Sequence, residues 1–138
     1  MASLIYDSFW DDLSRGAIDM DTDTFYVLLT TSSYSESKAS HTKRNAVTNE
    51  ITATGYTANG KVVACTVTKN TSTHQQTFQF ASVNWTSFTG TARKAVYYKY
   101  RGGTASTEEL VAVNDFGSDQ TLTASTLTVA ASTITLQN

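Results

Sequence analysis

The sequence predicts a mainly β protein, an antiparallel β-sandwich or jelly roll of seven to eight strands with one short N-terminal α-helix. The chain of 138 residues contains 25 threonines and no proline. Threonine, valine and tyrosine favour strands because their side chains pack well on a pleated, half-buried surface. The apolar runs are short and follow one amphipathic N-terminal segment. The length fits a single domain over residues 1–138.

The N-terminal segment is expected to form a helix over about residues 3–15. Its apolar residues recur at spacings near three and four, and Gly16 stands where the helix should end. So short a helix is marginal in water unless its apolar face is covered. Two interpretations stay open: the helix packs on its own sheet, which we favour, or it grips a neighbouring protein. The face contains Leu4, Ile5, Phe9, Trp10 and Leu13.

The strands are placed by hydrophobic pattern and by turn residues. Residues 25–31 are almost continuously apolar, which is typical of a central strand covered on both faces. Asn59-Gly60 predicts a turn into a strand over 61–69. Residues 77–81 form a further strand, 92–100 and 109–116 form a hairpin, and residues 122–136 supply the closing strands. The expected core contains Phe78, Phe80, Trp85, Val96 and Val113.

A polar, serine-rich stretch over about residues 32–50 is too long for an ordinary connection and is therefore expected to be functional or mobile. It contains Lys38, His41, Lys43 and Arg44. This positive charge on an otherwise acidic chain could pair with an acidic neighbour. A solvated face of the protein is the other interpretation, and we favour it.

Composition disfavours two classes of partner. The net charge is −2 and only 16% of the residues are charged, so phosphate-driven binding of nucleic acid is not expected. Tyrosines 97, 98 and 100 beside basic residues could stack on bases, but core packing is the favoured interpretation.

No run approaches the roughly 20 apolar residues of a membrane span. No signal peptide is visible, and assembly in the cytoplasm is expected.

Groups for catalysis or metal binding are sparse, and the sequence predicts neither an enzyme nor a cofactor. Cys65 lies in a strand-like run and is expected to be a small buried hydrophobe. The alternating Asp19, Asp21 and Asp23 resemble the start of a calcium loop, but the later glycine and glutamate positions hold threonines. Neither histidine has a second ligand at metal spacing. We therefore expect these carboxylates to form a polar turn.

Six segments share an order and spacing: 8–13 (SFWDDL), 21–27 (DTDTFYV), 54–61 (TGYTANGK), 83–86 (VNWT), 91–96 (TARKAV) and 113–117 (VNDFG). Together they resemble a family of small virion proteins of tailed bacteriophages. The resemblance covers most of the chain, whereas the basic stretch 35–49 departs from it.

The resemblance implies a non-enzymatic structural protein of the virion, foremost a head decoration or cement protein that binds the major capsid protein, or other virion proteins, as a trimer or another symmetric cluster. The alternatives are a tail, baseplate or fibre-associated adaptor, and a carbohydrate-binding module in which exposed Tyr34, Tyr56 or Trp85 stacks on sugars. The expected partner contacts are Phe9, Trp10 and Leu13 on the helix, with Lys43 and Arg44 in the basic stretch.

Overall fold

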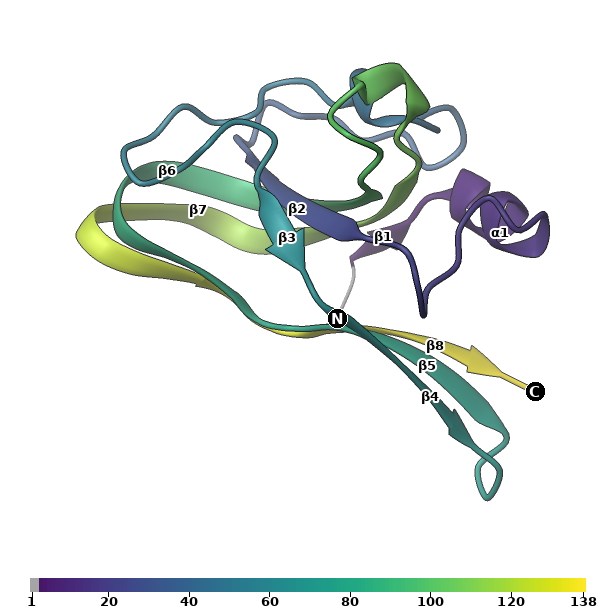
Figure 1. Cartoon of the computed structure of the whole chain (residues 1–138). Helices are drawn as coiled ribbons and strands as arrows, with labels where there is room; N and C mark the ends of the chain where they lie inside the picture. The colour runs from purple at the N-terminus through teal and green to yellow at the C-terminus, as the bar shows by residue number, and fades with distance from the viewer. Residues whose placement is uncertain (1–2) are drawn as a thin grey trace.

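The computed structural model describes residues 3–138 and contains eight strands in two antiparallel sheets with one short helix (Figure 1). The predicted mainly β, sandwich-like fold is therefore confirmed. The larger sheet has the order β1-β7-β6-β2-β3, and the smaller has the order β4-β5-β8. The elements are β1 (Leu4–Ile5), α1 (Asp7–Ser14), β2 (Phe25–Thr30), β3 (Lys61–Val63), β4 (Cys65–Asn70), β5 (Gln75–Phe80), β6 (Val83–Lys99), β7 (Leu110–Val129) and β8 (Ser132–Gln137), with 3-10 turns at Arg44–Ala46 and Ala105–Thr107.

A long bent ribbon joins the two sheets. β5 leads directly into β6, and β7 leads directly into β8, so two neighbouring strands pass together from one sheet to the other (Figure 1). The pairing register is unchanged across the bend, because Phe80 lies opposite Ser132 and Val83 lies opposite Val129. The smaller sheet is therefore the continuation of the central hairpin of the larger one, with β4 added at one edge.

The main core lies between the two sheets. One face of β2 supplies Phe25, Val27 and Leu29, and the smaller sheet supplies Phe78 and Phe80. The aromatic rings interlock, since Phe80 stacks on Tyr97 of β6 with 4.5 Å between ring centroids. The predicted core positions Phe78, Phe80 and Trp85 are all buried here.

A second core covers the opposite face of the larger sheet. It contains Tyr6, Leu28, Tyr34, Val96, Tyr98, Leu110 and Val113. The prediction that the run 25–31 is covered on both faces is confirmed, because Leu28 points into this cluster while its neighbours point into the main core. The central position in the sheet belongs to β6, however, and β2 lies beside it. Val96 and Val113 are buried as predicted, within the second core.

The helix is shorter than expected at its N-terminal end. It begins at Asp7 instead of residue 3, because Leu4 and Ile5 form a short strand that pairs with Val113 and Ala112 of β7. A helical pattern of apolar residues therefore included two that belong to the sheet. The helix packs on its own sandwich, with the Phe9 ring 6.4 Å from the Phe78 ring.

The predicted strand 61–69 is divided between the sheets. Residues Lys61–Val63 pair with β2, Ala64 lies at the corner, and Cys65–Asn70 pair with β5. The predicted turn before it is confirmed, since Asn59 and Gly60 have φ angles of 73° and 78°. Strands that bend at a corner and change sheet are common in sandwiches, and hydrophobic pattern alone does not reveal the corner.

Candidate interaction surface

The basic stretch is anchored to the protein instead of being free for a partner. Arg44 is 9% exposed, and its Nε donates to Oε1 of Glu108, which is fully buried. The other two guanidinium nitrogens donate to Asn59 Oδ1 at 2.8 Å and to the Gly103 carbonyl at 2.9 Å. The charge of Arg44 is therefore satisfied inside the fold, and little of this predicted contact residue is open to a partner.

Neighbouring lysines are also paired within the chain. Lys43 Nζ lies 3.4 Å from Glu109 Oε1, and Lys38 Nζ lies 4.0 Å from Asp7 Oδ1. Burial acts to raise the pKa of Glu109, but hydrogen bonds from Arg101 and the charge of Lys43 outweigh it and hold that pKa below its usual value. The Lys43 side chain is partly exposed, but its charge is paired with Glu109. The stretch therefore offers little net attraction to an acidic neighbour.

Residues 32–50 also cover the second core. The Tyr34 hydroxyl lies 2.7 Å from the Tyr6 hydroxyl, and Lys94 Nζ donates to the Tyr34 carbonyl at 2.8 Å. Tyr34 is only 1% exposed and Trp85 only 3% exposed. Tyr56 is half-buried, with its hydroxyl donating to Glu50. The expected exposure of Tyr34 and Trp85 is therefore wrong, and only Tyr56 of the three aromatic residues is partly open to solvent.

The expected helix contacts are only partly accessible. Phe9 is fully buried, so a partner cannot reach it in the folded protein. Trp10 and Leu13 are half-buried and pack against the main core. Tyr97 and Tyr98 are likewise fully buried, which leaves no base-stacking row on β6. Of the five predicted contact residues, Trp10, Leu13 and Lys43 remain partly open to solvent.

The aspartate run folds as the polar turn that was expected. Asp19 Oδ1 accepts hydrogen bonds from the backbone N–H groups of Asp21 and Thr22, and these lower the pKa of Asp19. Asp23 Oδ2 accepts the Asp19 N–H and lies 2.7 Å from Lys99 Nζ. Within residues 3–138, no three His, Cys, Asp or Glu side chains come together as metal ligands would.

Cys65 is expected to be an unreactive thiol. It lies half-buried at the start of β4, and burial raises the pKa of the thiol to about 11. Because the thiolate is the nucleophile, native protein at pH 8 should react with a disulfide reagent far more slowly than protein unfolded in urea. Equal rates in the two states, measured by release of the coloured thiolate, would contradict this.

The surface that the sequence did not reveal is an overhang of the smaller sheet. We use this term for residues 69–76 and 136–138, which project beyond the core at the free end of the β4–β5 hairpin (Figure 1). Gln76 and Leu136 are paired across β5 and β8 and stand on the same sheet face as Phe78 and Ile134. Unlike those buried residues, they lie past the edge of the core.

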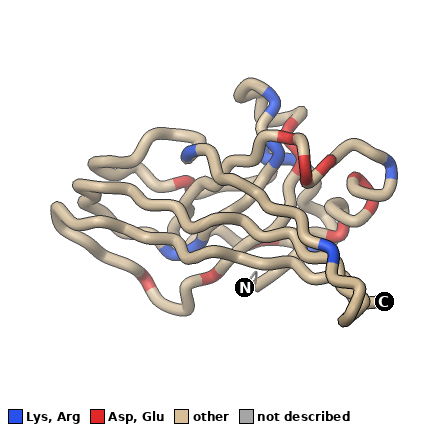
Figure 2. The backbone as a smooth tube through the Cα atoms, turned by 60° about the horizontal axis from the view of Figure 1, so that its bottom comes forward, with Lys and Arg blue, Asp and Glu red and all other residues tan. Residues whose placement is uncertain are grey.

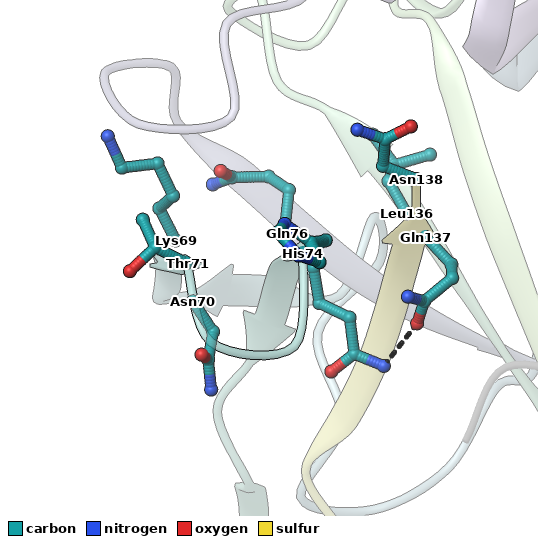
Figure 3. A pocket seen from close by; sticks show the side chains of 9 residues that line it. Lys69, Asn70, Thr71, His74, Gln76, Leu136, Gln137 and Asn138 are labelled. Atoms are coloured by element: carbon teal, nitrogen blue, oxygen red, sulfur yellow. Dashed lines mark hydrogen bonds between the residues drawn. The ribbon is translucent and has the colours of Figure 1, made fainter.

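An open hollow of about 590 Å³ lies at the overhang (Figure 3). It is lined by backbone and by polar side chains, including Lys69, Asn70, His74 and Gln137, with Leu136 as its large apolar member. A hydrogen bond of 2.6 Å between the Gln75 and Gln137 amides ties β5 to β8 at this end. Lys69 is the one charged residue in the three strands of this sheet, and charges gather elsewhere (Figure 2).

The surface of the overhang has features that a protein contact can use. A polar, nearly uncharged sheet surface can exclude water against a complementary partner, and its exposed edges offer backbone hydrogen bonds. No helix among residues 3–138 has the length and hydropathy needed to cross a bilayer. Comparison of the chain with family models, with curated proteins and with solved structures gives no match.

Proposed function

We propose that this chain is a non-enzymatic structural protein of a tailed-bacteriophage virion, which binds the outside of the head and stabilises it by bridging capsid subunits. The resemblance of six segments to virion proteins supports this assignment. The structural observation that carries it is the overhang, a sheet surface that extends beyond the core and is open on its inner face. A surface of this kind can reach across a seam between neighbouring subunits.

Two of the six resembling segments meet in space, which supports the argument from them. Lys61 Nζ donates to the Asn84 carbonyl at 2.6 Å and lies 5.4 Å from the centre of the Trp85 ring. Tyr56 packs against the same tryptophan, with 5.9 Å between ring centroids. Segments 54–61 and 83–86 therefore form one structural unit. A resemblance that includes residues building such a unit supports a shared fold, and function then depends on the outer surfaces.

Binding to the assembled head supplies a physical reason for the role. A protein that binds the mature shell, but not its separated subunits, stabilises the shell by mass action. The exposed sheet edges of the sandwich can add backbone hydrogen bonds to such a contact. The expected partners are the major capsid protein or other virion proteins, and the expected location is the virion surface.

Quantitative gel analysis of purified particles tests the proposal. A head protein should be present in hundreds of copies per particle, and heads lacking it should lose DNA at lower temperature than complete heads. Adding back purified protein should restore stability. A few to dozens of copies would favour the tail or baseplate adaptor instead, and absence from finished particles or turnover of a substrate would contradict both.

Two variants test whether the overhang makes the contact. Gln76→Arg places a bulky charge on the inner face of the overhang, whereas Gln79→Arg places it on the outer face of the same strand. We expect Gln76→Arg to abolish restoration of the heads and Gln79→Arg to preserve it. The reverse result would place the contact on the outer face of the sheet.

A further inference from the structure

The two sheets have four edge strands, and they differ in how well they are protected from pairing with another chain. β1 has two residues and β3 has three, which is too short for an extended ladder. β4 carries Lys69, and its Val67 lies beside the segment of Met20 and Asp21. β8 has six residues, STITLQ, with no charge, proline or glycine. It is therefore the edge best suited to accept another strand.

The backbone groups that β8 offers can be identified from its pairing with β5. The Asn138 N–H donates to the His74 carbonyl at 3.0 Å, which makes this a hydrogen-bonded pair. Bonded and non-bonded pairs alternate along an antiparallel ladder. Residues 132, 134 and 136 therefore bond to β5, and the N–H and C=O groups of Thr133, Thr135 and Gln137 point away from it. None of these groups has a hydrogen-bond partner within the described part of the chain.

We propose that β8 pairs with β8 of a second copy, antiparallel, across a two-fold axis that passes between the two Thr135 residues. In this register the outward groups of residues 133, 135 and 137 meet those of 137, 135 and 133 in the second copy. Each of these pairs exchanges two backbone hydrogen bonds. The two smaller sheets then form one continuous antiparallel sheet.

Side chains favour the same register. Leu136, which is 36% exposed, comes to lie opposite Ile134 of the second copy, so an exposed apolar residue gains an apolar neighbour. Thr135 faces Thr135 and Thr133 faces Gln137 on the outer face, and neither strand brings a charge to the contact. In this register β8 is complementary to itself. We therefore infer that the strand pairing with β8 comes from a second copy of the chain, because a two-fold contact uses the same surface on both copies.

Charge-swapped variants of Thr135 test the contact. The wild-type protein should have twice the 15.0 kDa mass of the chain by light scattering after size exclusion. Thr135→Lys and Thr135→Asp each place like charges opposite one another, and each should raise the dimer dissociation constant by about fivefold or more. A one-to-one mixture of the two variants should restore dimers, because opposite charges then meet at the axis.

Thr68→Lys is the matched control. Thr68 lies in the same outer-face row, paired through Thr77 to Thr135, but on the β4 edge. It adds the same charge and should leave the dimer unchanged, with circular dichroism confirming that all variants fold. A wild-type monomer or trimer, a mixture that fails to restore dimers, or weakening by Thr68→Lys but not by Thr135→Lys would overturn the proposal. These results are independent of head binding, so this proposal and the proposed function can fail separately.

Discussion

Gly60→Ala is expected to prevent stable folding. Gly60 has a φ of +78°, and a Cβ atom added there would lie 1.8 Å from the Val27 carbonyl oxygen and 2.6 Å from its carbon. These are backbone atoms in the middle of the sheet, since Val27 is paired with Lys61 on one side and Tyr97 on the other. The strand cannot move away without breaking both ladders, so the clash has no inexpensive relief.

The turn around Gly60 is also held from the second core. The Tyr98 hydroxyl donates to the Asn59 carbonyl at 2.6 Å, and the Asn59 N–H donates to Glu50. Shifting the turn to accommodate a methyl group would therefore break hydrogen bonds as well. We expect the free energy of unfolding to fall by more than about 4 kcal/mol, since strain at a special backbone site is one of the few causes of so large a loss. A loss of this size is comparable to the whole stability of a small domain.

Gly117→Ala separates the clash from the backbone conformation. Gly117 has a similar φ of +83°, but a Cβ atom there would meet nothing within 4 Å. Its cost should be about 1 to 2 kcal/mol, the ordinary penalty of a left-handed conformation. Urea unfolding of both variants, followed by circular dichroism, gives the comparison. Equal losses would mean that the approach of Gly60 to Val27 has no energetic consequence.

The turn and strands were predictable because their signals are local. Asn59-Gly60 identifies a turn by the φ angles that these residues tolerate, and the alternation around Phe78 and Phe80 identifies a strand face. The bend between the sheets carries no such signal. Residues 81–82 (Ala-Ser) and 130–131 (Ala-Ala) are small and carry no turn signal, and only pairing between distant strands reveals that the ribbon passes through both sheets.

The exposure of the predicted contact residues could not be read from the sequence, because burial of a charge depends on residues far along the chain. Arg44 resembles any basic loop residue, and its acceptor Glu108 lies 64 positions away. Phe9 was correctly assigned to an apolar face, but pattern alone does not say whether that face meets its own sheet or a neighbour. The overhang was missed for the opposite reason: Gln76 and Leu136 hold inward positions, and sequence does not show where the core beneath them ends.

The second large effect is expected from Arg44→Met. This change keeps most of the apolar stem of the side chain and removes the guanidinium, which leaves the fully buried Glu108 without its ion pair. The other carboxylate oxygen of Glu108 still accepts N–H bonds from Arg101 and Gly103, so the charge stays in place. Breaking one side of a buried pair costs about 3 to 5 kcal/mol. Urea unfolding should show a loss of that size.

Two further variants show whether the loss comes from the stranded charge. Arg15→Met removes an ion pair whose side chains are 75% and 61% exposed, and it should leave the urea midpoint almost unchanged, because water and salt screen an exposed pair. The double variant Arg44→Met with Glu108→Gln removes both charges and should recover part of the loss, because no buried charge is left unpaired. If the double variant is less stable than Arg44→Met alone, then the hydrogen bonds that Glu108 accepts from the 100–109 loop stabilise the fold more than its unpaired charge destabilises it. The loss in Arg44→Met would then come mainly from the contacts of Arg44 with Asn59 and Gly103, which hold residues 32–50 in place.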